Sequence, residues 1–159
     1  MKRLKRQYGL TLIELLIAVA LVVILVSMTL MVTNKSYSDA DAKAAEGTIA
    51  LLDSALQEYH DYYNYFPVYA AITDPALTSD EERRCAYLYR ELNSVPDSRK
   101  IIERISDSYI RRRGNFFIYI DSWGTVLDYI YSSDMNFPLI VSAGPDRNFG
   151  TADDITNKK

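Results

Sequence analysis

Residues 9–33 read GLTLIELLIAVALVVILVSMTLMVT, and this stretch decides the architecture of the chain. The 24 residues from Leu10 to Thr33 carry a single charged side chain, that of Glu14. As an α-helix rising about 1.5 Å per residue they extend roughly 36 Å, which exceeds a bilayer core of about 30 Å. We therefore expect residues 10–33 to form a transmembrane helix.

The residues before this stretch predict its orientation. Residues 1–9 carry Lys2, Arg3, Lys5 and Arg6 and no acidic side chain. Basic residues that flank a membrane span stay in the cytoplasm, so the body of the chain is expected across the membrane. The apolar stretch is also longer than the roughly 7–15 residues of a cleavable secretory signal, so it is expected to remain as an anchor.

Glu14 is unusual because an acid within a membrane span costs a few kcal/mol or more. One interpretation is that Glu14 lies near enough to the interface to reach water. The other is that it pairs with a cation. Cleavage after Gly9 would place a new amine on Leu10, and this amine could pair with Glu14 of a neighbouring subunit, so that both charges are neutralised in a low dielectric.

The run from Gly9 to Leu15, with its basic leader, resembles the class III signal of type IV pilins and type II secretion pseudopilins. This resemblance implies that a prepilin peptidase removes residues 1–9 and methylates Leu10, and that Glu14 guides packing into a filament. The chain departs from the common pattern in two places. Leu10 replaces the usual phenylalanine, and Met31 occupies the position of a proline that many members carry.

A helical pattern continues beyond the apolar stretch. Apolar and aromatic residues recur at alternating steps of four and three, which is the spacing of one helix face. They are Ala45, Ile49, Leu52, Leu56, Tyr59 and Tyr63. Because no proline occurs before Pro67, we expect one helix from about Leu10 to about Tyr63, whose second half packs against a globular head.

Short helices and strands are predicted for the rest of the head. Residues 79–82 (SDEE) have the spacing of a capping box and open a short helix, and isoleucines within 101–105 indicate a second one. Residues 116–120 and 125–131 predict a hairpin, and residues 137–142 a third strand.

Two further features of the head need an interpretation. Arg111, Arg112 and Arg113 are most simply a solvated charge run. Trp123, with the tyrosines, is expected in the core.

Two more segments resemble the major pseudopilins in particular. They are the run Ile49–Tyr59 that leads to Phe66-Pro67, and the turn Asp121-Ser122-Trp123-Gly124. The resemblance implies the pilin-like α+β fold, in which a long N-terminal helix packs on a small head with short helices and a C-terminal antiparallel sheet. The expected divisions are a leader at 1–9, a transmembrane and assembly helix at 10–33, and a periplasmic head at 34–159.

The stretch from Ser142 to Asp154 is rich in hard oxygen donors, which Ca²⁺ prefers. Its spacing does not match an EF-hand, and the spacing alone favours an ordinary surface turn. Major pseudopilins carry a similar segment and bind calcium there. That resemblance implies a structural Ca²⁺ held by Asp146, Asp153 and Asp154, with Ser142 and the carbonyl of Phe149 as further ligands.

Composition excludes several kinds of function. With 18 basic and 21 acidic residues the net charge is −3, so the chain lacks the excess of basic residues that is typical of nucleic-acid-binding proteins. One histidine and one cysteine exclude a multi-histidine metal site and a disulfide within the chain. An enzyme on a membrane anchor is disfavoured because no nucleophile has a base nearby in the sequence.

Three functions therefore stay open. The first is a major-type pseudopilin that drives protein export by type II secretion. Its partners would be further copies and other pseudopilins, the prepilin peptidase and the inner-membrane assembly platform. The second is a type IV or minor pilin for adhesion or DNA uptake. The third is a monomeric, membrane-anchored calcium-binding protein.

Overall fold

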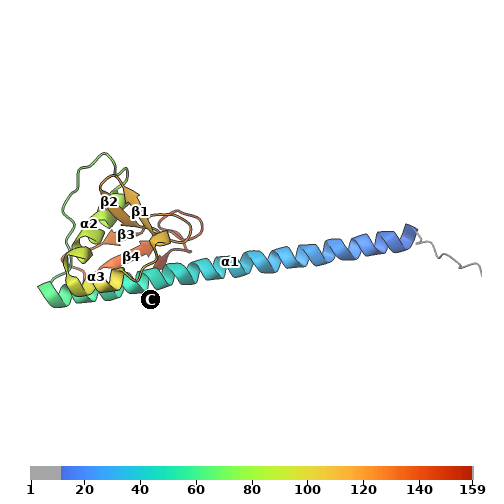
Figure 1. Cartoon of the computed structure of the whole chain (residues 1–159), viewed down its shortest axis with the longest axis horizontal. Coiled ribbons are helices and arrows are strands. Elements are labelled where there is room, and N and C mark those ends of the chain that lie inside the picture. Colours follow the sequence, from blue (N-terminus) through green and yellow to red (C-terminus); the bar gives the residue numbers. More distant parts are fainter. Residues whose placement is uncertain (1–11, 159) are drawn as a thin grey trace, which may run out of the picture. The chain divides into compact units, whose positions relative to one another are not determined.

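The computed structural model describes residues 12–158, and for residues 28–38 it describes the backbone alone. The chain divides into two compact units, one that ends at Ser38 and one that comprises Asp39–Lys159. Figure 1 shows the elements in chain order. Helix α1, Leu12–Tyr63, is 52 residues long and belongs to both units, which confirms the long helix over all of its described length.

The first unit is the N-terminal part of α1. Side chains 12–27 are exposed on every face of the helix, and most of them are aliphatic. Among the residues that the structure describes, no helix combines the length and the apolarity that crossing a membrane requires.

The second unit begins at Asp39 and contains the core. The predicted apolar face of α1 is buried, and its central residues Leu52 and Leu56 are completely inaccessible. Tyr63 is the exception. It is 39% exposed because the helix ends there and the chain turns away at Asn64, which has a positive φ of 58°.

Two short helices cover this core. Helix α2, Asp80–Ser94, begins at the N-cap Ser79, whose hydroxyl accepts from the amide of Glu82 at 3.2 Å, as the capping-box spacing predicts. Pro96 occupies the first turn of α3, Pro96–Ile102, where its missing N–H costs no hydrogen bond. Ser98 fixes α3 on α1 by donating to the carbonyl of Ala55 at 2.7 Å.

The strands form two small antiparallel sheets. Strand β1, Ile110–Arg113, pairs with β2, Phe116–Tyr119. The second sheet has the order β3-β4-β5, with β3 at Asp128–Ile130, β4 at Leu139–Ser142 and β5 at Ile155–Thr156. The fold is therefore α+β and pilin-like, as expected.

The predicted hairpin is confirmed only next to its turn. There Ile120 bridges Val126, and the amides of Asp121 and Leu127 donate to the carbonyls of Thr125 and Tyr119 at 2.8 and 3.0 Å. The rest of the pairing was wrong, because residues 116–119 pair with 110–113. The arginine run is a strand because Gly114, at φ 58°, turns the chain back. Arg111 and Arg113 are half-buried, and the guanidinium of Arg113 donates to the carboxylate of Glu82 at 3.1 Å.

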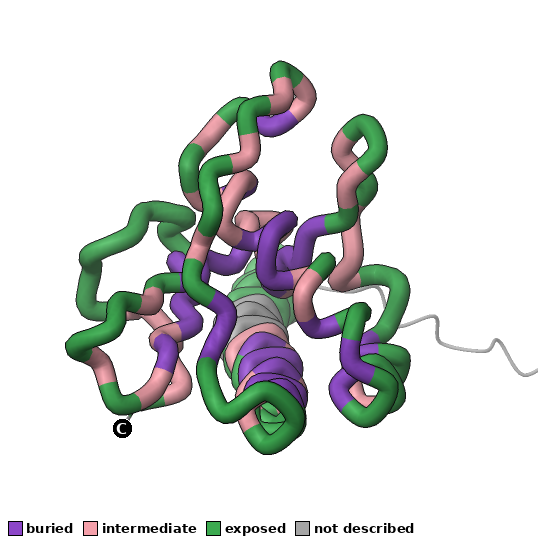
Figure 2. The backbone as a smooth tube through the Cα atoms, turned by 90° about the vertical axis from the view of Figure 1, so that its left-hand side faces the viewer, coloured by how far each residue is buried: buried purple, intermediate pink, exposed green. Residues whose placement is uncertain are grey.

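The core that α1, α2 and the sheets enclose is mainly aliphatic and includes several aromatic residues. Tyr59, Tyr119 and Tyr129 are at most 2% exposed, as predicted, whereas Tyr62 and Tyr65 are more than half exposed, so the prediction is wrong for them. Figure 2 shows the buried stretches gathered inside this unit. Trp123 is only half-buried, so its assignment to the core was wrong. It lies in a turn whose backbone, rather than its indole, is fixed by hydrogen bonds.

Cys85 lies in the same core. Its sulfur accepts from the amide of Tyr119 at 3.1 Å, and burial raises the pKa of the thiol to about 12. A thiol that stays protonated and inaccessible is unreactive, so Cys85 serves packing.

Candidate functional site

Three residues that the sequence assigns to processing and assembly lie near the N-terminus. Gly9 and Leu10 are outside the described residues. Glu14 lies near the N-terminal limit of the described part of α1, where its side chain is exposed.

The acidic loop, residues 143–154, follows strand β4 and leads into β5. Gly144 turns the chain at a φ of 65°, and a side chain there would collide with the carbonyl oxygen of Asp153. Only glycine allows this close approach, which brings the two ends of the loop together. Arg147, at φ 61°, donates its amide to the carbonyl of Gly144 at 3.2 Å and completes the turn.

Hydrogen bonds within the loop occupy its carboxylates. Asp153 accepts from the amide of Asp146 at 3.2 Å and from the hydroxyl of Thr151 at 2.6 Å. The Thr151 bond lowers the pKa of Asp153, so this carboxylate is ionised at neutral pH. Asp154 accepts from the amide of Gly150 at 2.8 Å, and Asp146 accepts from that of Asn148 at 2.8 Å.

The donor chemistry of this loop suits Ca²⁺, because hard carboxylate and carbonyl oxygens are concentrated in it. Among residues 12–158, however, no three acidic, histidine or cysteine side chains are grouped closely enough to hold a metal ion. The structure therefore brings Asp146 and Asp153 next to each other through one hydrogen bond, and it does not converge them with Asp154 on one point. Phe149 lies in the loop with its side chain 38% exposed.

Ser142 has a different environment from the carboxylates. It is fully buried, and its hydroxyl donates to Asp121 at 2.7 Å while accepting from the amide of Gly144 at 3.2 Å. The other oxygen of the Asp121 carboxylate accepts from the amides of Trp123 and Thr125 at 3.0 and 2.8 Å. Asp121 is 2% exposed, so a buried carboxylate fixes both the tryptophan turn and the start of the acidic loop.

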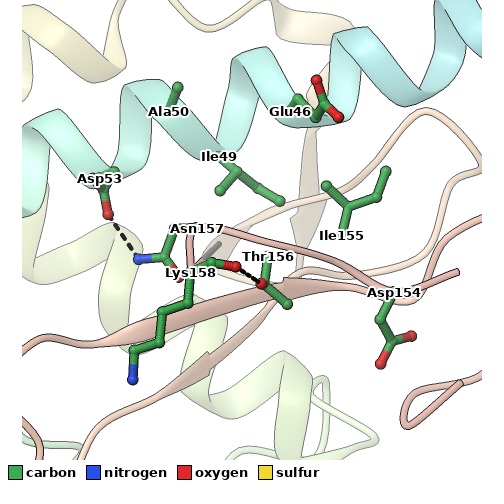
Figure 3. Close-up of a pocket in the computed structure, with 9 residues that line it drawn as sticks. All are labelled: Glu46, Ile49, Ala50, Asp53, Asp154, Ile155, Thr156, Asn157 and Lys158. Atoms are coloured by element: carbon green, nitrogen blue, oxygen red, sulfur yellow. Dashed lines mark hydrogen bonds between the residues drawn. The ribbon is translucent and has the colours of Figure 1, made fainter. Parts of the chain in front are cut away.

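A groove of about 530 Å³ lies between α1 and the end of the chain, and its lining residues come from both (Figure 3). Ile49 and Ile155 form apolar walls, and the carboxylates of Glu46 and Asp154 flank them. Asn157 crosses the groove and donates to Asp53 of α1 at 2.7 Å.

Sequence reasoning missed two residues of this region, Asp121 and Asn157. A signal existed for Asp121, since an aspartate that opens a turn commonly accepts from the amides that follow it. Asn157 gave no local signal, because its partner Asp53 is 104 residues away in the sequence.

Comparison with known proteins finds a motif at the N-terminus and relatives along nearly the whole chain. The model of the prokaryotic N-terminal methylation motif matches residues 4–30. The type II secretion system core protein G of Escherichia coli (strain K12) is 26% identical over 157 residues, with 99% of this chain and 94% of the relative covered. Its namesake from Pectobacterium carotovorum subsp. carotovorum is 27% identical, with 96% and 85% covered.

No solved structure matched the chain. The matched range contains Lys5, Arg6, Gly9 and Glu14, and the two relatives cover 99% and 96% of the chain. Over nearly its whole length the chain is thus similar to type II secretion system core proteins G, and its N-terminal region carries the prokaryotic N-terminal methylation motif.

Proposed function

We propose that this protein is a structural subunit of a type II secretion pseudopilus, a filament of many copies that drives protein export. The observation that carries the proposal is the match of nearly the whole chain to two core proteins G, combined with the methylation motif at its start. A long helix whose C-terminal third is buried in the core of the head suits such a subunit. Its role would be structural, with no reaction catalysed.

The mechanism follows from the charges near the N-terminus. Before assembly, residues 10–33 would anchor the subunit in the inner membrane as a single span, with the N-terminus cytoplasmic and the head periplasmic. Removal of residues 1–9 by a prepilin peptidase would leave a methylated amine on Leu10. Pairing of this amine with Glu14 of a neighbouring copy would set the register as subunits leave the membrane. Apolar surface would move from lipid to neighbouring helices, so burial is maintained during extraction.

A type IV or minor pilin for adhesion or DNA uptake shares this processing and anchoring. The relatives favour secretion, because both are named as core proteins of a type II system. We therefore propose that the other pseudopilins of such a system and its inner-membrane assembly platform are the partners of this chain.

Mass spectrometry of the full chain extracted from membranes tests the processing step. We expect the mature mass to lack residues 1–9 and to include one additional methyl group. Imaging of filaments with antibody against the head tests assembly of the same material. A filament built of chains that retain residues 1–9 contradicts the proposal, and so does a processed chain found only as a monomer when the secretion system is present.

We also propose that the acidic loop binds Ca²⁺. The charged ligands would be Asp146, Asp153 and Asp154, and the oxygen of Ser142 and the carbonyl of Phe149 would complete the site. The support is the chemistry of these donors and the hydrogen bond from the backbone amide of Asp146 to the carboxylate of Asp153, which keeps the two residues adjacent. A bound cation would offset the repulsion between the carboxylates and hold the loop against the sheet.

Thermal unfolding of the full chain in detergent tests this site. We expect calcium at about 100 times its dissociation constant to stabilise the head by about 2.7 kcal/mol, and chelator to remove that gain. Asp146→Ala should abolish the response, and Asp134→Ala, an exposed acid outside the loop, should retain it. Equal melting temperatures with calcium and with chelator would falsify the proposal.

A further inference from the structure

The end of the chain is held by side-chain bonds of Asn157. Strand β5 has only two residues, and two pairs, Val141 with Thr156 and Ser142 with Ile155, join it to β4. So short an edge strand adds little stability by itself. The acidic loop comes directly before β5, so whatever fixes β5 also fixes the far end of this loop.

Asn157 supplies three hydrogen bonds at this point. Its amide nitrogen donates to Asp53 of α1 at 2.7 Å and to the carbonyl of Pro138 at 2.9 Å. Its amide oxygen accepts from the backbone N–H of Ile140 at 3.0 Å. Both donors and the acceptor of the carboxamide are therefore used, and they bridge α1, the start of β4 and the chain end.

The near end of the loop is fixed to α1 as well. Ser142 donates to the buried carboxylate of Asp121, and the neighbouring Ser122 donates to the carbonyl of Asp41 in α1 at 2.9 Å. The loop is thus fastened to α1 at two places, Asp41 and Asp53, which are about 18 Å apart along the helix.

We propose that Asn157 is a positioning residue that couples the acidic loop to α1, so that the loop, β5 and the adjacent part of the helix open and close as one unit. The Asn157 bonds to Asp53, Pro138 and Ile140 are called the C-terminal clasp below.

This proposal deepens the proposed function, because α1 is the helix that would pack in the filament, but its test does not need assembly. The full chain is measured as a monomer in detergent, so the experiment tests the C-terminal clasp whether or not the protein forms filaments. Hydrogen exchange followed by mass spectrometry reports residues 144–156 and residues 46–56 of the helix separately.

Asn157→Ala is expected to speed exchange by about tenfold or more in both segments, since amide protection reports the local opening equilibrium. Asp53→Ala should speed exchange in the same two segments. The double variant should be no faster than the faster single variant, because the two residues act through one bond. Lys158→Ala is the matched control and should leave exchange unchanged, since the bond that Lys158 accepts from Thr156 uses its backbone carbonyl.

The reciprocal exchange Asp53→Asn with Asn157→Asp separates this coupling from a general structural role. It recreates an amide-to-carboxylate bond between α1 and the chain end, so we expect it to restore the protection of residues 46–56 relative to Asn157→Asp alone. Faster exchange confined to residues 155–158, or additive effects of the two alanine variants, would overturn the proposal. Should Asn157→Ala fail to fold, Asp53→Ala alone decides, because unchanged exchange at residues 144–156 excludes the coupling.

Discussion

Replacement of Glu14 by alanine is expected to abolish filament assembly while leaving membrane insertion and removal of residues 1–9 intact. The apolar stretch that directs insertion is unchanged, and cleavage occurs before Leu10, so neither step needs the carboxylate. Assembly differs because the methylated amine of a neighbouring copy would be left as an uncompensated charge. Loss of one partner from a buried ion pair costs about 3–5 kcal/mol. Repeated at every subunit, that cost is enough to prevent polymerisation.

Two measurements on the same cells check this expectation. Intact mass from the membrane fraction reports processing, and electron microscopy of the sheared or extracted filaments reports assembly. Glu14→Gln should also fail to assemble, because it keeps the shape of the side chain and removes the charge. Val19→Ala, a change elsewhere in the same apolar stretch, is the control and should assemble. Filaments of normal number and length from Glu14→Ala would contradict the pairing of the amine with Glu14.

The features that could be predicted from the sequence are those set by local spacing. The buried face of α1 follows from the three- and four-residue steps of Ile49, Leu52 and Leu56, and the start of α2 follows from Ser79 and Glu82. Even here one detail was not foreseeable. The carboxylate of Glu82 accepts from the amide and hydroxyl of Thr78 and not from the N-cap amide.

The bonds from Thr78 to Glu82 have an energetic reason. Burial opposes ionisation of Glu82, but the bonds from Thr78 and the guanidinium of Arg113, at 3.1 Å, outweigh it and keep the pKa of this carboxyl below its usual value. Arg113 reaches Glu82 from strand β1, which the sequence did not predict as a strand. The hydrogen-bond partners of Glu82 therefore depend on the pairing of β1 with β2, which no local sequence pattern predicts.

The contacts of the site that join residues far apart in the sequence could not be predicted either. Ser142 is 21 residues from Asp121, and Asn157 is 104 residues from Asp53, so both bonds arise only after the head has closed. The sequence correctly identified a segment rich in carboxylates. It could not show that Thr151 and the loop amides already satisfy these carboxylates.

Among substitutions in the head, Asp121→Ala is expected to cause one of the largest losses of stability. Its carboxylate, 2% exposed, accepts from the amides of Trp123 and Thr125 and from the hydroxyl of Ser142. Alanine would leave three donors without a partner in a buried site, and each unsatisfied group costs about 1–3 kcal/mol. Allowing for relaxation of the turn toward water, we expect the free energy of unfolding to fall by roughly 3–5 kcal/mol. Urea unfolding of the full chain in detergent, followed by the fluorescence of the single tryptophan, measures it.

The matched comparison is Asp121→Asn, which keeps one carbonyl oxygen for the two amides of the turn. Its new NH₂ group would face the hydroxyl of Ser142, which can turn its proton away and accept, so the expected loss is only about 1 kcal/mol. Asp134→Ala removes an exposed acid from a different turn and should change stability by less than about 0.5 kcal/mol. If Asp121→Ala unfolds at the same urea concentration as Asp134→Ala, the carboxylate is not what holds the tryptophan turn to strand β4. If Asp121 acts as a buried acceptor of three hydrogen bonds, the alanine variant should be the least stable, the asparagine variant intermediate and the wild type the most stable. Equal losses for the alanine and asparagine variants would instead identify the negative charge as the stabilising element.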